Sequence, residues 1–406
     1  MHIFIANAHW NNRGDEAAHR AFWESILELY PDCHLTIMFK DRKPITWFPK
    51  QKNVQFFSCQ FTAPLWDIWL TVLSRGICGR DANLKMAVKR MKSADCVVYS
   101  PGGSVINDRF YWSKQLEYLV PFFCAKIFRT PMFVAAPSMG PFHGHRWLRK
   151  WLLKTPQTLC VRESISKDYL DQIGIHKTVH VTQDLAFLND IDVEANAAAL
   201  KGNTELNQFL GTYKKVVGIT LSDFKWHVKH GKNPELLKRI DNSFSAFIRD
   251  LAKRGYGVLL IPQLFGNQDD THLLNKYVYG QHTQVMSNHF DSAFQQYIIS
   301  KLFAVVGVRY HGNIFAAKMG TPFIPISYEE KMTGYLDSSG YSDFSILLED
   351  ISFDRIRKKF AELEVQHDDL QTRLINDRES WRKAAFSTIE LFRSFCLQWV
   401  TTPAKS

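Results

Sequence analysis

The chain has 406 residues, which is too long for one ordinary hydrophobic core and predicts two domains. Hydrophobic residues make up 46% of it, and the formal net charge of +10 favours either an acidic partner or a lysine-rich surface.

Seven scattered cysteines without a CxxC pair argue against a disulfide framework and indicate reduced thiols. The most apolar stretches, residues 61–78 and 119–139, are interrupted by Asp67 and by Lys126 and Arg129, so we expect no transmembrane helix. The first ten residues lack the pattern of a signal peptide and predict a strand.

Short apolar runs alternate with longer helix-like segments along the chain. The first series of apolar runs lies at residues 2–6, 34–39, 95–103, 130–141 and 158–164. The second series lies at residues 215–221, 256–263, 282–287, 303–308 and 321–327. This alternation predicts parallel sheets with helices on both faces. Between the two series, residues 189–213 are polar and rich in Ala, Gly and Asn, which suits a connection between domains.

The predicted fold is therefore α/β, with two Rossmann-like domains that face each other across a cleft. The first domain is expected over residues 1–195, the second over 214–370, and a C-terminal helix over 371–406. One apolar stripe with helical spacing marks this last helix: Trp381, Ala385, Ile389, Phe392, Cys396 and Trp399. We expect the helix to pack across the seam between the domains. Ligands of such sheets bind beyond the carboxyl ends of the strands, so the residues that follow each apolar run are the informative ones.

In the first half of the chain, glycine-containing turns follow the apolar runs. Asn12, Arg13, Gly14 and Asp15 follow the first run; Gly14 permits a tight turn, and Asp15 is a candidate helix cap. On local pattern alone, a simple turn from strand to helix is the favoured explanation.

Two further turns of the first half carry candidate ligand groups. Gly102 and Gly103 precede Ser104 and Asp108, and paired glycines allow a backbone to approach a ligand closely. Arg162 follows the run at 158–161, where an ion pair with its neighbour Glu163 is the structural alternative to ligand binding.

Three cations follow the last two apolar runs of the second series. Arg309 and His311 lie between the run at 303–308 and a helix closed by Gly320, and Lys331 lies just past the next run. All three are expected at one point of the sheet edge. A buried cationic cluster is unfavourable without an anion, which a ligand or the neighbouring Glu329 and Glu330 would supply. Arginine and lysine suit a carboxylate or phosphate, and histidine delivers protons, so a small phosphorylated acid fits the set.

Seven motifs in order resemble those of the polysaccharide pyruvyltransferase family, with a motif order close to its colanic-acid branch. They span roughly residues 1–340 and comprise Asn12–Asp15, Gly102–Ser104 with Asp108, Ser138–Phe142, Arg162–Ser164, Gln183-Asp184 with Ala186, Gly307–His311, and Tyr328-Glu329 with Lys331. The resemblance implies a fold like that of GT-B glycosyltransferases. It also implies transfer of the pyruvyl unit of phosphoenolpyruvate onto a sugar of an exopolysaccharide, with a cyclic ketal as product.

The resemblance also implies roles for individual residues. His311 would be the acid that protonates phosphoenolpyruvate, Arg309, Lys331 and Arg162 would bind its phosphate and carboxylate, and no cofactor or metal would be needed. Asp15 or Asp108 would orient or deprotonate the sugar hydroxyl. The acceptor would lie in the first domain and phosphoenolpyruvate in the second, with these acceptor-binding residues: Asn12, Arg13, Gly102, Gly103 and Ser104. Tyr310, Gly312 and Asn313 depart from the usual family pattern, which leaves the identity of the sugar open.

Other interpretations predict different ligands. A nucleotide-sugar glycosyltransferase of the same architecture would use the cations to bind a diphosphate. The DxD sequence at 190–192 falls in the polar connection and is expected to be a solvated loop. The histidine pairs at 143 and 145 and at 227 and 230 lack nearby Cys or acidic partners, so we predict no metal site. No nucleic-acid-binding signature is evident.

Two segments combine basic residues with aromatic ones, at 40–52 and at 146–154. They predict a peripheral contact with anionic lipid, suited to a lipid-linked acceptor and a cytoplasmic protein at the inner face of the membrane. The alternative is that Trp147, Leu148, Trp151 and Leu152 pack into the core.

Overall fold

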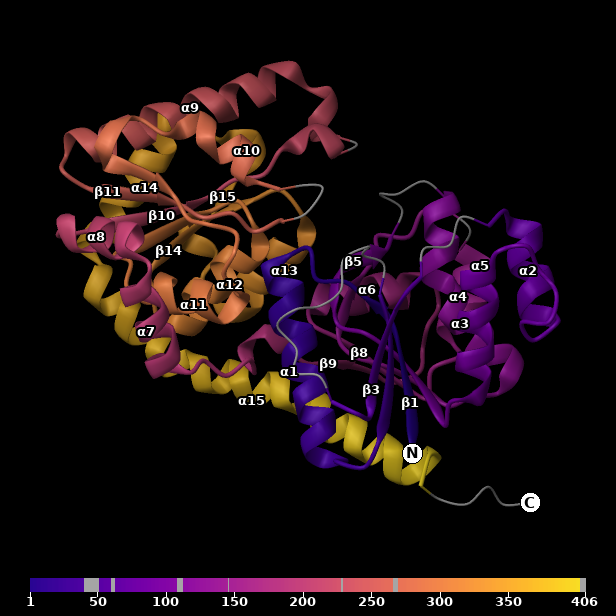
Figure 1. The fold of residues 1–406 in the computed structure, drawn as a ribbon. Helices are drawn as coiled ribbons and strands as arrows, with labels where there is room; N and C mark the ends of the chain where they lie inside the picture. The colour runs from indigo at the N-terminus through magenta and orange to yellow at the C-terminus, as the bar shows by residue number, and fades with distance from the viewer. Residues whose placement is uncertain are drawn as a thin grey trace. The chain divides into compact units, whose positions relative to one another are not determined.

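The structure is a computed structural model, and it describes residues 1–39, 51–59, 63–107, 112–144, 146–227, 229–265 and 269–401. The chain divides into two compact units (Figure 1). The first unit comprises Met1–Trp10, Ala18–Leu188 and Arg382–Ser406. The second unit comprises Asn11–Ala17 and Asn189–Trp381.

A seven-stranded sheet forms the centre of the first unit. Its strand order is β3-β2-β1-β4-β6-β8-β9, and the neighbouring strands pair in parallel. The strands are β1 (His2–Ala8), β2 (His34–Phe39), β3 (Val54–Ser58), β4 (Cys96–Tyr99), β6 (Met132–Val134), β8 (Thr158–Val161) and β9 (Val179–Val181). Central strands such as β4 are apolar along their whole length and fully buried, as expected for a parallel sheet covered on both faces. A short parallel pair, β5 (Gly102–Ile106) and β7 (Pro137–Met139), follows β4 and β6.

The helices of the first unit follow its strands in the chain. They are α1 (Arg13–Leu29), α2 (Leu65–Leu73), α3 (Ala82–Ser93), α4 (Trp112–Phe128), α5 (Arg146–Leu153) and α6 (Ser164–Gln172). Local sequence sets their ends where a cap is present: Asp81 accepts hydrogen bonds from the backbone N–H groups of Asn83 and Leu84 and so starts α3.

The second unit has a six-stranded parallel sheet with the order β12-β11-β10-β13-β14-β15. Its strands are β10 (Val216–Thr220), β11 (Gly257–Leu260), β12 (Thr283–Val285), β13 (Ala304–Gly307), β14 (Phe323–Ser327) and β15 (Ile346–Leu347). Its helices are α7 (Val193–Gly202), α8 (Thr204–Thr212), α9 (Pro234–Lys253), α10 (Thr271–Leu274), α11 (Ser292–Ile299), α12 (Tyr310–Met319), α13 (Glu330–Ser339) and α14 (Phe353–Val365). The predicted α/β alternation in two series is confirmed.

The polar segment at 189–213, predicted as a connection between domains, contains helices α7 and α8. Asp192 accepts a hydrogen bond from the backbone N–H of Ala195, and Asn203 accepts one from that of Leu206. These caps, together with the helix-favouring alanines of α7, outweigh the polar composition. The DxD sequence at 190–192 itself lies in a loop with both aspartates exposed, as predicted, and its last residue, Asp192, caps α7.

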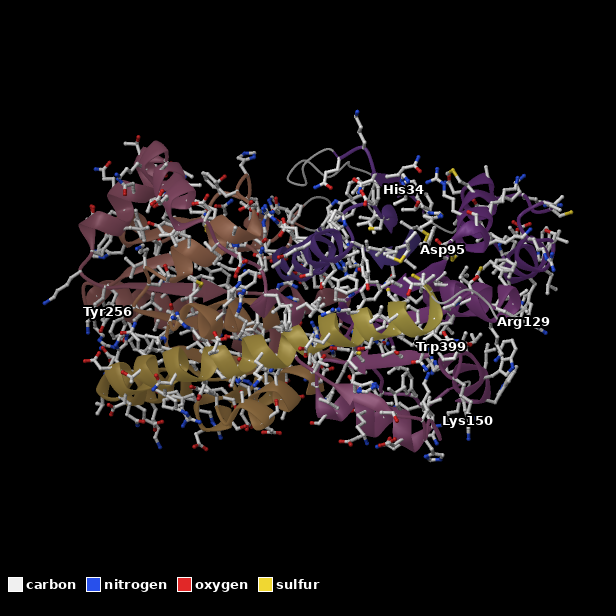
Figure 2. All side chains as sticks on the ribbon, turned by 90° about the horizontal axis from the view of Figure 1, so that it is seen from below. His34, Asp95, Arg129, Lys150, Tyr256 and Trp399 are labelled. Atoms are coloured by element: carbon white, nitrogen blue, oxygen red, sulfur yellow. The ribbon has the colours of Figure 1, made fainter. Side chains whose placement is uncertain are left out.

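The C-terminal helix α15 (His367–Trp399) contributes to the cores of both units and is the long yellow helix of Figure 2. In the second unit, Trp381 packs its ring edge-on against Tyr335 and Tyr341. In the first unit, Phe392 packs against Phe22 and Phe133. The predicted apolar stripe is buried from Trp381 to Cys396, whereas Trp399 is exposed.

No helix among the described residues is long and apolar enough to cross a membrane. All seven cysteines lie in the described part of the chain, and none forms a disulfide bond.

Candidate active site

Arg309 and His311 lie where the sequence predicts them, at the carboxyl end of β13 and in the first turn of α12. The lack of a side chain at Gly307, the last residue of β13, leaves room for Asn313 of α12, because a Cβ there would lie 2.1 Å from Oδ1 of Asn313. In its place, the Asn313 side-chain amide donates a hydrogen bond of 2.9 Å to the Gly307 carbonyl. Gly320 closes α12 in the left-handed conformation, as expected for a helix C-cap.

The Arg309 side chain is buried and has a carboxylate partner, Asp270. Its Nε also donates to the Leu221 carbonyl at 3.1 Å. The other carboxylate oxygen of Asp270 accepts from the backbone N–H groups of Gln263 and Leu264 at 3.0 and 2.9 Å. Arg309 is thus fixed in place by a carboxylate that is itself fixed to the backbone. Asp270 was not among the predicted site residues and is separated from Arg309 by 39 positions. The only feature of the sequence that points to it is the acidic pair Asp269-Asp270 after the strand β11.

Lys331 lies in the first turn of α13, with its Nζ 2.7 Å from a carboxylate oxygen of Glu329. The same Nζ lies 5.7 Å from the centre of the Tyr310 ring, whose neighbour along α12 is His311. Lys331 therefore lies near the first turn of α12, and Glu329 is the internal counter-ion that the sequence analysis kept as an alternative. The side chain of Glu330 lies outside the described residues.

The segment Asn11–Ala17 belongs to the second unit, although the sequence analysis placed it in the first domain. Asn12 forms an isolated antiparallel bridge with Leu264, and the Arg13 backbone N–H donates to the Gln263 carbonyl at 2.9 Å. These bonds attach Asn12 and Arg13 to the segment that follows β11. They bring the turn at Asn12–Asp15 to the same loop that fixes Asp270.

Gly14 provides the surface against which His311 rests. A Cβ built on Gly14 would lie 1.7 Å from Cγ and 2.0 Å from Nδ1 of His311, so the imidazole occupies the space of a missing side chain. The Asn12 side chain accepts a hydrogen bond of 2.8 Å from the Gly14 backbone N–H and thereby caps α1. Asp15, predicted as the cap, instead lies buried inside the first turn of the helix.

A buried ion pair attaches this segment to the second unit. Arg13 pairs with Glu16 at 2.5 Å, donates to the Asn288 carbonyl at 2.6 Å and stacks 4.0 Å above the Phe265 ring. Glu16 also accepts from the backbone N–H of Ser292 at 2.9 Å. Burial raises the pKa of Glu16, while the Arg13 cation and the Ser292 N–H act in the opposite direction. These contacts make Arg13 a positioning residue for Gly14 rather than an evident acceptor ligand.

Arg162 lies in the first unit and is almost fully buried. Its Nε donates to Ser138 Oγ at 2.7 Å, and its guanidinium pairs with Asp184 at 2.5 Å and with Glu163 at 3.3 Å. Asp184 also caps the short 3₁₀ helix Leu185–Phe187 through the backbone N–H of Ala186. Three of the seven motifs therefore meet in one buried network at the ends of β6 and β8.

Replacing Arg162 by methionine is expected to lower the free energy of unfolding by about 3–5 kcal/mol, because the change leaves two carboxylates buried without their cation. Lys167→Met is the matched control: Lys167 pairs with Asp171 on the surface of the same unit, so we expect a loss below about 1 kcal/mol. Urea unfolding followed by circular dichroism measures both. Wild-type stability combined with lost turnover in Arg162→Met would instead assign Arg162 to the ligand.

Of the four remaining predicted residues, Gly102 and Gly103 are described in full, Ser104 is described in its backbone only, and Asp108 is not described. Gly102 pairs in register with Pro137 and has a φ of +125°, a conformation that favours glycine. A Cβ at Gly103 would meet no described atom within 4 Å. Ser104 lies in β5, but its side chain is outside the described residues, as is Asp108.

Among the described residues, no group of three or more His, Cys, Asp or Glu side chains is placed to hold a metal ion. The rings of His227 and His230 stack with their centres 4.3 Å apart, and the His230 backbone N–H donates to Nδ1 of His227. His143 is exposed, and residue 145 lies outside the described part of the chain.

Comparisons with known proteins agree with this architecture. The structure is similar to the MnaA–UDP complex of S. aureus, with a TM-score of 0.62 and 10% identity over 99% of this chain and 98% of that one. It is also similar to the UDP-GlcNAc 2-epimerase of Neisseria meningitidis bound to UDP-GlcNAc, with a TM-score of 0.58 and 13% identity over 98% and 100% of the two chains. At such identities the likeness establishes the fold, which is of the GT-B type.

Sequence comparisons identify the family. The amylovoran biosynthesis protein AmsJ of Erwinia amylovora is 24% identical over 284 residues. That match covers 64% of this chain and 63% of AmsJ, which is less than two thirds of the relative's length. The model of the family "Polysaccharide pyruvyl transferase" matches residues 12–330, from the turn that carries Gly14 to the start of α13. The chain therefore belongs to the polysaccharide pyruvyl transferase family.

Proposed function

We propose that the protein transfers the pyruvyl group of phosphoenolpyruvate onto a sugar of an exopolysaccharide or of its lipid-linked precursor. The products are a pyruvate ketal and phosphate. The observation that supports this most directly is the placement of His311 against Gly14, in the helix turn that follows Arg309. Membership of the family and the similarity to a protein of amylovoran biosynthesis support a polysaccharide acceptor. The absence of disulfides among the seven cysteines is consistent with a cytoplasmic reaction.

His311 is the proposed acid. It donates a proton to the methylene carbon of phosphoenolpyruvate, and the central carbon becomes cationic. One sugar hydroxyl attacks this carbon and forms the first C–O bond. A second hydroxyl forms the other C–O bond as the bond to phosphate breaks. Of the two protons that the hydroxyls lose, one replaces the proton given by His311 and the other leaves with phosphate, so the reaction balances.

The cations bind the two anionic groups of the donor. The guanidinium of Arg309 has five N–H donors, and its contacts with described residues engage Nε and Nη2. We assign the Nη1 donors to phosphoenolpyruvate. Because Asp270 fixes the guanidinium in advance, little side-chain entropy is lost when the donor binds. Lys331, near Tyr310, supplies a second positive charge to the phosphate as it leaves. Asp15 or Asp108 stays the proposed group for orienting or deprotonating a sugar hydroxyl.

The donor can be tested directly. We expect phosphate release from phosphoenolpyruvate to depend on a galactose, glucose or mannose glycoside, with the ketal identified by mass spectrometry. In deuterium oxide, the methyl group of the product should gain one deuterium, because the proton reaches carbon from the solvent through His311. Sugar transfer from nucleotide sugars, without any reaction of phosphoenolpyruvate, would contradict the proposal and favour a glycosyltransferase.

A further inference from the structure

Helix α2 of the first unit exposes an apolar face. Its buried side is formed by Asp67, Ile68, Thr71 and Val72. The side chains on its opposite side are all apolar and exposed: Leu65, Trp66, Trp69, Leu70 and Leu73. A soluble helix normally places polar residues on its outer face, so a helix whose exposed side is entirely apolar points to a second contact.

Helix α5 extends this surface through a shared aromatic ring. Phe123 of α4 lies between the two helices, with its ring 4.3 Å from that of Trp69 and 6.0 Å from that of Trp151. Leu73, which is 59% exposed, lies one helical turn from Trp69. Trp147, which is 72% exposed, lies one helical turn from Trp151. Figure 1 shows α2, α4 and α5 grouped together in the first unit. Of the four residues expected either at lipid or in the core, Leu152 is buried and Trp147 is not.

The charges around this surface have one sign. In the described segments 63–80 and 146–154, Asp67 is the only acidic residue, and it is buried with its carboxylate accepting from the backbone N–H groups of Arg80 and Asp81. The basic residues of these segments that are at least partly exposed are Arg75, Arg80, Arg146, Lys150 and Lys154, whereas Arg149 is buried. Arg80 lies 4.9 Å from the Trp66 ring, and Lys126 of α4 lies 4.8 Å from the Trp151 ring. Surfaces that insert shallowly into anionic bilayers typically contain tryptophans flanked by cations.

We infer that α2 and α5 form a membrane-docking surface for an anionic lipid bilayer. The tryptophans and leucines enter the interface between headgroups and acyl chains, while the surrounding cations contact anionic headgroups. A symmetric pairing of two copies through this face fits less well, because it would bring the same cations together on both sides. The inference goes beyond the proposed reaction and does not depend on it, since the surface is defined without reference to His311 or to phosphoenolpyruvate.

Flotation of the full chain with vesicles tests this surface. We expect the wild-type protein to float with vesicles of phosphatidylcholine mixed with phosphatidylglycerol, to float poorly with phosphatidylcholine alone, and to be partly released by salt. The double variant Leu73→Glu/Trp147→Glu should bind at least about tenfold less, because it places carboxylates in the interface. Phe386→Glu, an exposed aromatic position on α15, is the matched control and should float like the wild type.

Three outcomes would overturn the inference. The first is that the wild-type protein does not float with anionic vesicles. This outcome does not depend on whether a variant folds. The second is equal flotation of the double variant, with circular dichroism showing that it is folded. The third is a concentration-dependent dimer in lipid-free solution that the double variant loses, which would assign the face to a second copy of the chain. Turnover of the double variant with a water-soluble glycoside should equal that of the wild type, so failure of docking and failure of the proposed reaction are distinguishable.

Discussion

Replacing His311 by asparagine should lower kcat for phosphate release from phosphoenolpyruvate by about 100- to 10,000-fold, which is the usual contribution of a positioned acid. Asparagine is close to histidine in size and keeps a hydrogen-bonding group, but it cannot deliver a proton near neutral pH. The His311 side chain is buried in the first turn of α12. Steady-state phosphate release with a responsive glycoside measures the effect.

His282→Asn is the control for a general effect of losing an imidazole in the second unit. His282 lies just before β12 and contacts the Tyr256 carbonyl. We expect its substitution to leave kcat unchanged. If His311→Asn keeps wild-type kcat while remaining folded, the proposed acid is wrong and the proton comes from another group.

Replacing Gly14 by alanine should lower kcat/KM by about 100-fold, although Gly14 need not touch either substrate. The new methyl group would occupy the position of the His311 ring, and a displacement of about 1 Å in a reacting group costs roughly this much. Alanine is favoured over glycine inside a helix by about 1 kcal/mol, which offsets part of the clash. The expected result is therefore a folded protein with a misplaced acid, measured by phosphate release together with thermal unfolding.

A double-mutant cycle separates this explanation from a general disturbance of α1. In a His311→Ala background the clashing ring is absent, so adding Gly14→Ala should cost little further activity. Gly211→Ala in α8 is the matched helical control, because a Cβ there would meet no described atom within 4 Å. An equal loss from Gly14→Ala in both backgrounds would show that Gly14 acts independently of His311.

The placement of Arg309 and His311 could be predicted because it depends on local pattern. The apolar strand ends at Gly307, and a helix closed by Gly320 begins three residues later at Tyr310, so the turn between them falls at the sheet edge. The pairing of Arg309 with Asp270 could not be predicted in this way. It joins the loops that follow two different strands, and periodicity within either segment carries no information about that contact.

The two roles of Arg162 illustrate the same limit. Its contact with Glu163 is local, and the sequence analysis had it as an alternative. Its stronger contact with Asp184 connects residues 22 positions apart and depends on the strand order of the first sheet. The helices α7 and α8 could have been predicted from the sequence. Their signal is the capping residues Asp192 and Asn203, which lie in a segment of polar composition.

Helix α1 begins in one unit and ends in the other, since Arg13–Ala17 belong to the second and the rest of the helix to the first. The proposed acid of the second unit therefore rests on Gly14, which lies far before it in the chain. A truncated protein that starts at residue 189 would lack Gly14 and the ion pair that fixes it. Chimeras made by exchanging halves between related enzymes would combine the histidine of one parent with the glycine turn of the other, so both partners must be transplanted together.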